Sequence, residues 1–184
     1  EVLGILNAVL KTERISLTER KPAVAPVTAV QRRDISGGTK FKNKIVALAC
    51  STGGPKALQS VIPYLPANLD APMVLVQHMP AGFTNSMANR LDEISKIHVK
   101  EAENGEVLKK GTVYIAPGGK HMEVKKCPDG SHKIVYNDMP PIGGLKPCAN
   151  ITYDSLRTCG YDQVVCVVLT GMGADGTNGI LELS

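Results

Sequence analysis

The chain has 184 residues, of which 43% are hydrophobic and 4% aromatic, and its formal net charge is +4. This length and composition predict one domain of ordinary core size with some additional sequence. No stretch reaches the roughly 18 uninterrupted apolar residues of a membrane span, and the N-terminus lacks the basic-then-apolar layout of a secretory signal. We therefore expect a cytoplasmic protein without direct membrane insertion.

The positive charge is concentrated near the N-terminus. Residues 1–44 hold nine of the 21 basic residues and four of the 17 acidic residues, so the remainder is almost neutral. A nucleic-acid-binding surface needs clustered positive charge with aromatic side chains nearby. We expect no nucleic-acid partner.

The first 43 residues differ in character from the rest. Residues 1–11, EVLGILNAVLK, have the apolar spacing of one helical face, which suggests the last helix of a preceding domain within residues 1–20. Residues 21–43 mix proline, glycine and scattered charge without periodicity, as linkers do. The main folded unit is therefore expected to span residues 44–184.

From Lys44 onward, short apolar runs alternate with helical patterns. Strands are predicted at 44–50, 71–79, 97–102 and 162–169, and helices at 54–65, 82–95 and 150–160. Residues 111–138 depart from this alternation, with two or three strands separated by Pro-Gly-Gly and Pro-Asp-Gly turns. The predicted fold is α/β: a wound, mostly parallel sheet flanked by helices, with an antiparallel hairpin near the edge.

The five cysteines form no CxxC pair and leave one over. This pattern argues against a disulfide framework and against a structural zinc site. We expect reduced, mostly packed thiols and no metal.

Three polar residues follow apolar strands at the predicted carboxyl edge of the sheet. Ser51 follows the first strand, His78 the second, and Asp175 lies in the glycine-rich loop after the last. Ligand crevices of open parallel sheets lie at this edge. An imidazole that takes a serine proton, and is itself oriented by a carboxylate, makes that serine a nucleophile. The placement therefore favours acyl transfer by Ser51, His78 and Asp175.

Each of these residues also has a simpler interpretation. Ser51 and Thr52 before a helix can be only a cap, His78 can be a hydrogen-bonded loop histidine, and Asp175 before glycine can be a turn residue. His121 could also reach the crevice, while His98 and His132 are expected to face solvent. From the residues alone, both interpretations stay open.

The same loop contains a competing motif. Residues 171–176, GMGADG, match the G-x-G-x-x-G pattern of dinucleotide-binding loops and follow an apolar strand. That motif normally opens a fold and needs an acidic residue about 20 positions later, but Ser184 is the last residue. Nucleotide binding through Gly171, Gly173 and Gly176 is therefore a weaker alternative.

Four stretches in register closely resemble the catalytic domain of bacterial chemotaxis protein-glutamate methylesterases, the CheB type. They are ACSTGGPKAL, VLVQHMPAGFTNSMANRL, VYIAPGGKHMEV and VVLTGMGADGTNGI. The resemblance implies a triad of the nucleophile Ser51, the base His78 and its partner Asp175. It also implies an oxyanion-hole role for the Met172 backbone N–H and a site-lining position for Thr52.

The resemblance implies a function and its partners. The expected reaction is hydrolysis of glutamate γ-methyl esters on the methylated cytoplasmic helices of chemoreceptors, with methanol released, possible glutamine deamidation and no cofactor. The expected second partner is the protein's own N-terminal receiver domain, a response-regulator module of two-component signalling. Residues 1–20 would be the end of that receiver and 21–43 the linker, so this chain would be a fragment without the phosphorylated aspartate. A catalytically silent receptor-docking domain is a further alternative.

The chain departs from the family pattern in three places. Cys50 stands where a small residue such as alanine is usual, and Cys148 and Asn150 stand where a serine and an aspartate are common. A polar contact near the site is expected to differ. The family also continues for a further helix and strand after the point where this sequence ends, so a truncated C-terminus is expected.

Overall fold

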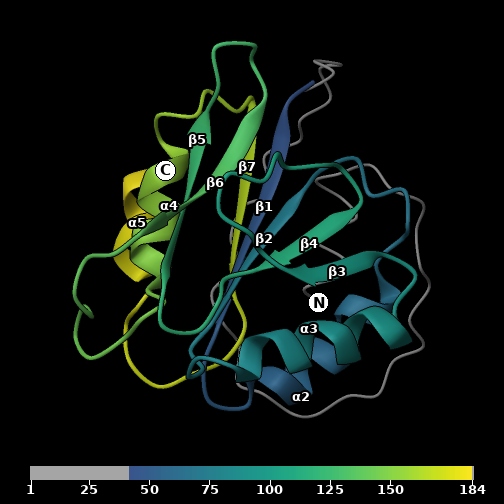
Figure 1. Ribbon diagram of the computed structural model, residues 1–184, viewed down its shortest axis with the longest axis vertical. Helices are drawn as coiled ribbons and strands as arrows, with labels where there is room; N and C mark the ends of the chain where they lie inside the picture. The colour runs from purple at the N-terminus through teal and green to yellow at the C-terminus, as the bar shows by residue number, and fades with distance from the viewer. Residues whose placement is uncertain (1–41, 184) are drawn as a thin grey trace, which may run out of the picture.

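The computed structural model describes residues 42–183. The predicted receiver end at 1–20 lies outside the described residues, as does the predicted linker up to residue 41. The main sheet has five parallel strands in the order β3-β4-β2-β1-β7 (Figure 1). Their bounds are β1 Lys44–Cys50, β2 Met73–Gln77, β3 His98–Glu101, β4 Thr112–Ile115 and β7 Gln163–Val168.

The interior strand β1, between β2 and β7, is buried on both faces, as its continuous apolar run predicts. Val46, Leu48 and Cys50 pack into one hydrophobic cluster. The alternate residues Ile45, Ala47 and Ala49 pack into a second cluster on the opposite face. A core on each face fixes the register of β1, because a slip of one residue would exchange the two sets.

Helices cover both faces of the sheet. Helices α2 (Gly54–Gln59) and α3 (Phe83–Ile94) contribute to the first cluster, and α4 (Ala149–Leu156) and α5 (Thr177–Leu183) to the second. In Figure 1, α2 and α3 lie below the sheet on the right, while α4 and α5 lie on the left. The predicted α/β fold with helices on both faces is confirmed.

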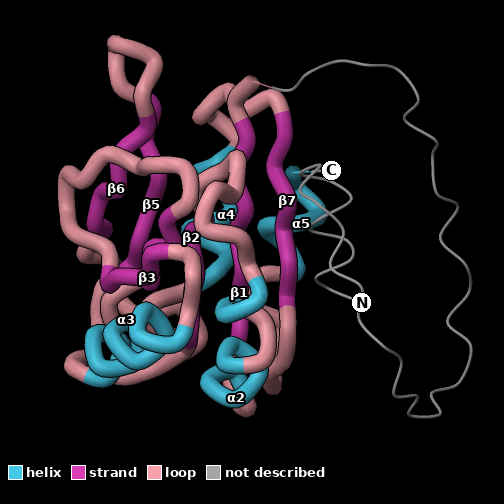
Figure 2. Tube along the Cα trace, turned by 90° about the vertical axis from the view of Figure 1, so that its right-hand side faces the viewer, coloured by secondary structure: helices cyan, strands magenta, loops and turns pink. Residues whose placement is uncertain are grey.

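The predicted antiparallel hairpin is β5 (His121–Lys126) paired with β6 (His132–Asn137). It forms its own two-stranded sheet and packs with α4 in the second cluster. Figure 2 shows the hairpin on the opposite side of the molecule from β7. The strand that precedes the hairpin, β4, joins the parallel sheet between β3 and β2.

One predicted helix is shorter than its pattern suggests. A continuous helix over 54–65 is wrong: α2 ends at Gln59, and a separate 3-10 turn, η1, covers Ile62–Tyr64. Pro63 lies in that turn and has no backbone N–H, so it cannot continue an α-helical hydrogen-bond series. The apolar spacing continues through the break because Leu58, Ile62 and Leu65 all pack into the first cluster.

Candidate active site

Ser51 lies immediately beyond β1 at the carboxyl edge of the sheet, which faces downward in Figure 1. Its backbone N–H donates to the carbonyl of Thr170 at 2.8 Å, which continues the β1–β7 pairing by one residue. Gly171 packs so closely that a Cβ there would lie 2.7 Å from the Ser51 Cβ. The turn after Ser51 needs Gly53, whose φ of 80° is a left-handed conformation that favours glycine.

His78 follows β2 and reaches the loop that follows β7. Its Nε2 lies 2.7 Å from Asp175 Oδ2, and the two side chains are only 12% and 6% exposed. A carboxylate can only accept, so the Nε2 of a neutral ring carries the proton and donates it. This leaves Nδ1 as the basic nitrogen of His78, and Nδ1 is buried without a hydrogen-bond partner among the described residues.

Asp175 is held by the first residues of α4 as well as by His78. The backbone N–H groups of Ala149 and Asn150 donate to its carboxylate at 2.6 and 2.9 Å, and the Cys148 thiol donates at 3.1 Å. Burial alone would raise the pKa of Asp175, but the hydrogen bonds from His78 and these donors hold that pKa well below its ordinary value. Asp175 is therefore a fixed negative charge that orients the imidazole.

One pocket contains all three residues. Ser51, His78 and Asp175 line it, together with residues from the ends of β1 and β7 and from the following loop: Ala49, Cys50, Val168, Thr170, Gly171, Met172 and Gly173. No hydrogen bond joins Ser51 Oγ to the His78 ring in the part of the chain that the structure describes. In free enzymes this contact is often long and tightens only with substrate bound.

Backbone N–H groups without a hydrogen-bond partner lie beside Ser51. Within residues 42–183, neither Met172 nor Thr52 donates its N–H to another group. Met172 is 87% exposed and lines the pocket. Thr52 is exposed and does not line the pocket, and its carbonyl accepts a hydrogen bond from Thr170 Oγ1.

Comparison with known proteins agrees with this geometry. The family model described as CheB methylesterase matches residues 46–184. The chain belongs to the CheB methylesterase family. A protein-glutamate methylesterase/protein-glutamine glutaminase from Geobacillus kaustophilus is 46% identical over 166 residues, covering 87% of this chain and 47% of the relative. A protein of the same name from Oceanobacillus iheyensis is 49% identical over 145 residues, covering 78% and 41%.

The fold is also that of a solved CheB domain. The crystal structure of the Thermotoga maritima CheB methylesterase catalytic domain matches with a TM-score of 0.74 and 45% identity, covering 77% of this chain and 74% of that one. The predicted family and fold are thereby confirmed. This chain spans about half the length of the relatives named above, since it covers 47% and 41% of them.

The glycine-rich loop of this CheB-family chain is occupied by internal contacts. Gly171 packs on Ser51, Asp175 holds His78, and the Gly176 N–H donates to Asn150 Oδ1 at 3.0 Å. These contacts tie the loop to the nucleophile, the base and α4, and the matching family model is a methylesterase. The nucleotide alternative is therefore not favoured.

The remaining histidines have structural roles or face solvent. His121 is fully buried: its Nδ1 accepts from the Cys148 N–H at 3.2 Å and its Nε2 donates to Pro140 O at 3.2 Å. His98 has a 58% exposed side chain, as predicted. The prediction that His132 faces solvent is wrong, because it is 5% exposed and stacks on Tyr161.

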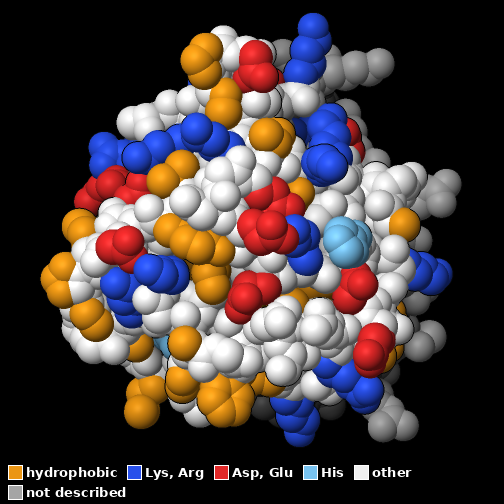
Figure 3. Space-filling view, viewed as in Figure 1, with side chains coloured by type: hydrophobic (Ala, Val, Ile, Leu, Met, Phe, Trp, Pro, Cys, Tyr) orange, Lys and Arg blue, Asp and Glu red, His pale blue; other side chains and the backbone are white. Residues whose placement is uncertain are grey.

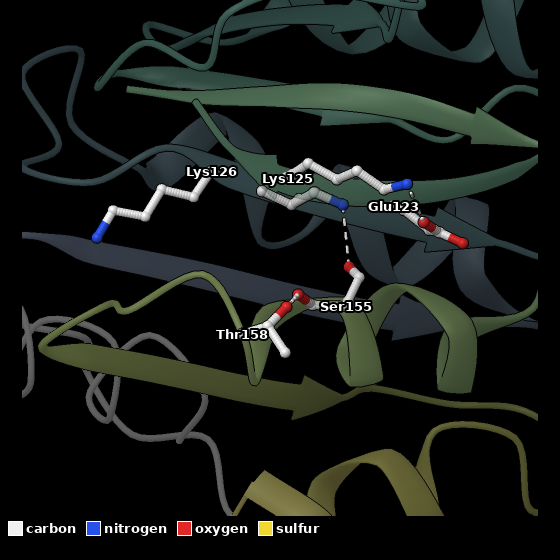
Figure 4. A pocket seen from close by; sticks show the side chains of 6 residues that line it. Glu123, Lys125, Lys126, Ser155 and Thr158 are labelled. Carbon is white, nitrogen blue, oxygen red and sulfur yellow. Dashed lines mark hydrogen bonds and ion pairs between the residues drawn. The ribbon is translucent and has the colours of Figure 1, made fainter. Parts of the chain in front are cut away.

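A second hollow lies between β5 and α4 (Figure 4). There the Val124 N–H donates to Ser155 Oγ at 2.9 Å, and Lys125 pairs with Glu123 at 3.5 Å. Lys126 extends away from Ser155 in this view. Ser155 also donates to the carbonyl of Thr152, so its hydroxyl both donates and accepts within the fold.

All five cysteines are free thiols, and Cys50, Cys148 and Cys159 are buried. Burial raises the pKa of Cys50 to about 12, and burial together with the neighbouring Asp175 raises that of Cys148 to about 11. Both thiols are therefore protonated donors at neutral pH. Within residues 42–183, no cluster of three or more His, Cys, Asp or Glu could hold a metal ion, and no helix is long and apolar enough to cross a membrane.

Sequence reasoning missed the residues that hold the triad in place. Gln77, the last residue of β2, is 2% exposed and hydrogen-bonded to both strand ends. A buried polar residue directly before His78 was the available signal, because buried amides are nearly always hydrogen-bonded. The α4 donors to Asp175 are backbone groups, which leave no trace in the sequence.

Proposed function

We propose that this chain is a serine hydrolase that removes methyl groups from glutamate γ-methyl esters of bacterial chemoreceptors. The single observation that carries the proposal is the 2.7 Å contact between His78 Nε2 and Asp175 Oδ2 in a pocket that Ser51 also lines. Family membership and the names of the relatives support the substrate class. No cofactor is needed for this chemistry.

In the proposed mechanism, Ser51 Oγ attacks the ester carbonyl while His78 Nδ1 takes the hydroxyl proton. The resulting imidazolium is stabilised by the Asp175 carboxylate, whose low pKa keeps it ionised. The Met172 N–H stabilises the oxyanion, and Thr52, which follows the nucleophile in the chain, stays a predicted site-lining residue. His78 then returns the proton to the departing methanol, and water releases the acyl group from Ser51 by the reverse steps.

The same acyl-enzyme accounts for deamidation of receptor glutamines, with ammonia in place of methanol as the leaving group. The names of the relatives include protein-glutamine glutaminase, which supports this second activity. An amide is the poorer substrate because its nitrogen must be protonated before it leaves. His78 would supply that proton as it does for methanol.

The proposed partners are the methylated cytoplasmic helices of chemoreceptors and the protein's own receiver domain. A cytoplasmic location follows from the position of these helices, and no nucleic-acid contact or membrane insertion is expected. Large hydrophobic side chains are exposed on segments that follow the strands: Met172 is 87% exposed and Phe83 63%. Hydrophobic side chains also gather along the lower, carboxyl edge in Figure 3, which suits a protein substrate.

Labelling of the serine tests the proposal. We expect a fluorophosphonate to modify Ser51 in the wild type, as located by peptide mass spectrometry, and methylated receptor to release methanol. Ser51→Ala should abolish both, and His78→Gln should slow both by about 10²- to 10⁴-fold because the general base is lost.

The control is Ser60→Ala, which removes an exposed hydroxyl at the end of α2. Ser51 of this variant should be labelled at the wild-type rate. A wild type that is labelled elsewhere, or that keeps methanol release after Ser51→Ala, would contradict the proposal. Absence of both Ser51 labelling and methanol release in the wild type would instead support the receptor-docking alternative.

A further inference from the structure

The side chain of Gln77 joins the two strand ends that carry the nucleophile and the base. Its Nε2 donates to the carbonyl of Ser51 at 3.1 Å and to the carbonyl of His78 at 3.1 Å. Gln77 lies directly opposite Cys50 in the register of β1 and β2. One amide group therefore spans the gap between the residues that follow each strand.

These bonds stand where the backbone pairing of β1 and β2 ends. The last backbone bond between the two segments runs from the His78 N–H to Cys50 O at 3.1 Å. Beyond it the chains diverge, Ser51 toward α2 and His78 toward α3. The Gln77 amide supplies the next link, so the spacing of Ser51 and His78 is set by a side chain.

Chemistry fixes the orientation of this amide. Both neighbouring carbonyls can only accept, so the NH₂ group must face them. The oxygen Oε1 then faces Cys50, whose thiol donates to it at 3.1 Å. The high pKa of Cys50, raised by burial, keeps this thiol protonated as a donor. The NH₂ group and the oxygen of Gln77 and the thiol of Cys50 are thus all hydrogen-bonded, and one orientation of the amide satisfies all three.

Packing leaves this arrangement little freedom. Gln77 is 2% exposed, and a Cβ on Gly54 would lie 1.9 Å from its Oε1. The start of α2 therefore closes over the amide, and a side chain at residue 54 would displace it. Rotation of the amide would place Oε1 against two carbonyl oxygens, which electrostatic repulsion disfavours.

We propose that Gln77 is a positioning residue, oriented by Cys50, that holds Ser51 and His78 at the spacing needed for proton transfer. It touches neither the substrate nor the reacting atoms. The inference rests on the proposed function, because it concerns how the same serine is activated. Displacements of about 1 Å in such a pair can cost roughly 100-fold in rate.

The test measures the rate at which a fluorophosphonate labels Ser51 in the whole chain, alongside thermal unfolding. Gln77→Met keeps the length of the side chain but removes both donors, and we expect labelling about 10- to 100-fold slower than in the wild type. Tyr114→Phe is the matched control, since it removes a buried hydroxyl that accepts from the Lys109 N–H at 2.9 Å outside the pocket. Its labelling rate should stay within about twofold of wild type, because distant sites do not couple.

A second pair keeps the test decisive if Gln77→Met does not fold. Cys50→Ala leaves Gln77 in place but removes the thiol that orients it, so labelling should slow by a few fold, and Cys50→Ser, which keeps a donor, should restore it. The proposal is overturned if Gln77→Met labels within twofold of wild type, or if it slows no more than Tyr114→Phe at an equal loss of thermal stability. If Gln77→Met does not fold, equal rates for wild type and Cys50→Ala overturn it. Absence of any labelling at Ser51 in the wild type is a different outcome, which refutes the proposed function itself and this inference with it.

Discussion

Asp175 combines a fixed negative charge with a buried position, which is stable only because donors surround it. Its carboxylate accepts from His78, from two backbone N–H groups of α4 and from the Cys148 thiol. A buried carboxylate without such partners would take up a proton. These contacts therefore serve both the stability of the fold and the proposed orientation of the base.

The pH dependence of stability tests this interpretation. A carboxyl with a lowered folded pKa stabilises the protein above its unfolded pKa of about 3.9, and that stabilisation is lost as the pH falls toward the folded value. We expect the free energy of unfolding to be higher for the wild type than for Asp175→Asn. This difference should be largest at neutral pH and should shrink below about pH 4. Urea unfolding at pH 7, 5 and 3 measures it.

Asp154→Asn is the control for that measurement, since it removes an exposed carboxylate on α4 that pairs with Arg157. Exposed pairs contribute little, about 0 to 1 kcal/mol. If the difference between wild type and Asp175→Asn were the same at all three pH values, the carboxylate would not be held as described.

At the scale of elements, α4 and α5 cap each other's N-termini. Asp175, in the loop before α5, accepts from the first backbone N–H groups of α4. In return, Asn150 Oδ1 on α4 accepts from the N–H groups of Gly176 and Gly179 at 3.0 and 2.9 Å. A Cβ on Gly179 would lie 2.7 Å from the Tyr153 Cβ, so glycine permits this close approach. The cap thus connects the position of Asp175 to the packing of two helices.

Two substitutions of Asn150 distinguish the contribution of its acceptor oxygen from that of the rest of its side chain. Asn150→Ala leaves two N–H groups without a partner and should lower the free energy of unfolding by about 1 to 2 kcal/mol. Labelling of Ser51 should also slow. Loss of the contact to Gly176 would shift the neighbouring Asp175, which orients His78. Thermal unfolding and fluorophosphonate labelling measure the two effects.

Asn150→Asp is the matched variant, because it keeps an acceptor for both N–H groups at the same length. It should stay close to wild type in thermal stability and in labelling rate. Equal losses for Asn150→Ala and Asn150→Asp would show that the amide group, and not its oxygen, is what the two helices need.

At the scale of the whole molecule, residues 42–183 contain both hydrophobic clusters and the residues named above that line the pocket. Immediately before β1, the backbone N–H groups of Lys42 and Asn43 each donate to Asp162 Oδ2 at 3.0 Å.

A chain that starts at residue 42 should therefore keep the site. We expect its rate of Ser51 labelling to stay within about twofold of the 184-residue chain, with a similar midpoint of thermal unfolding. A loss of labelling by 10-fold or more, with folding retained, would show that the first 41 residues take part in the site. Such a result would contradict the assignment of residues 21–43 as a linker.

The amino-acid sequence by itself determined the parallel sheet and the edge at which the site lies. Apolar runs such as 44–50 and 162–169 predict strands of a parallel sheet, although β7 proves to be a partly buried edge strand. The residues that follow parallel strands share one edge. Ser51, His78 and Asp175 could be selected for that reason, before their contacts were known.

Only the tertiary structure decided how these residues are held. The Gln77 amide reaches Ser51, 26 positions away, and the Cys148 thiol reaches Asp175, 27 positions away. The α4 donors to Asp175 are backbone N–H groups, which do not depend on the residue type. Local periodicity reports which face of an element is buried, but it contains no information on which distant donor meets which acceptor. That pairing depends on how the strands and helices pack, and so does the burial of His132, which was wrongly expected to face solvent.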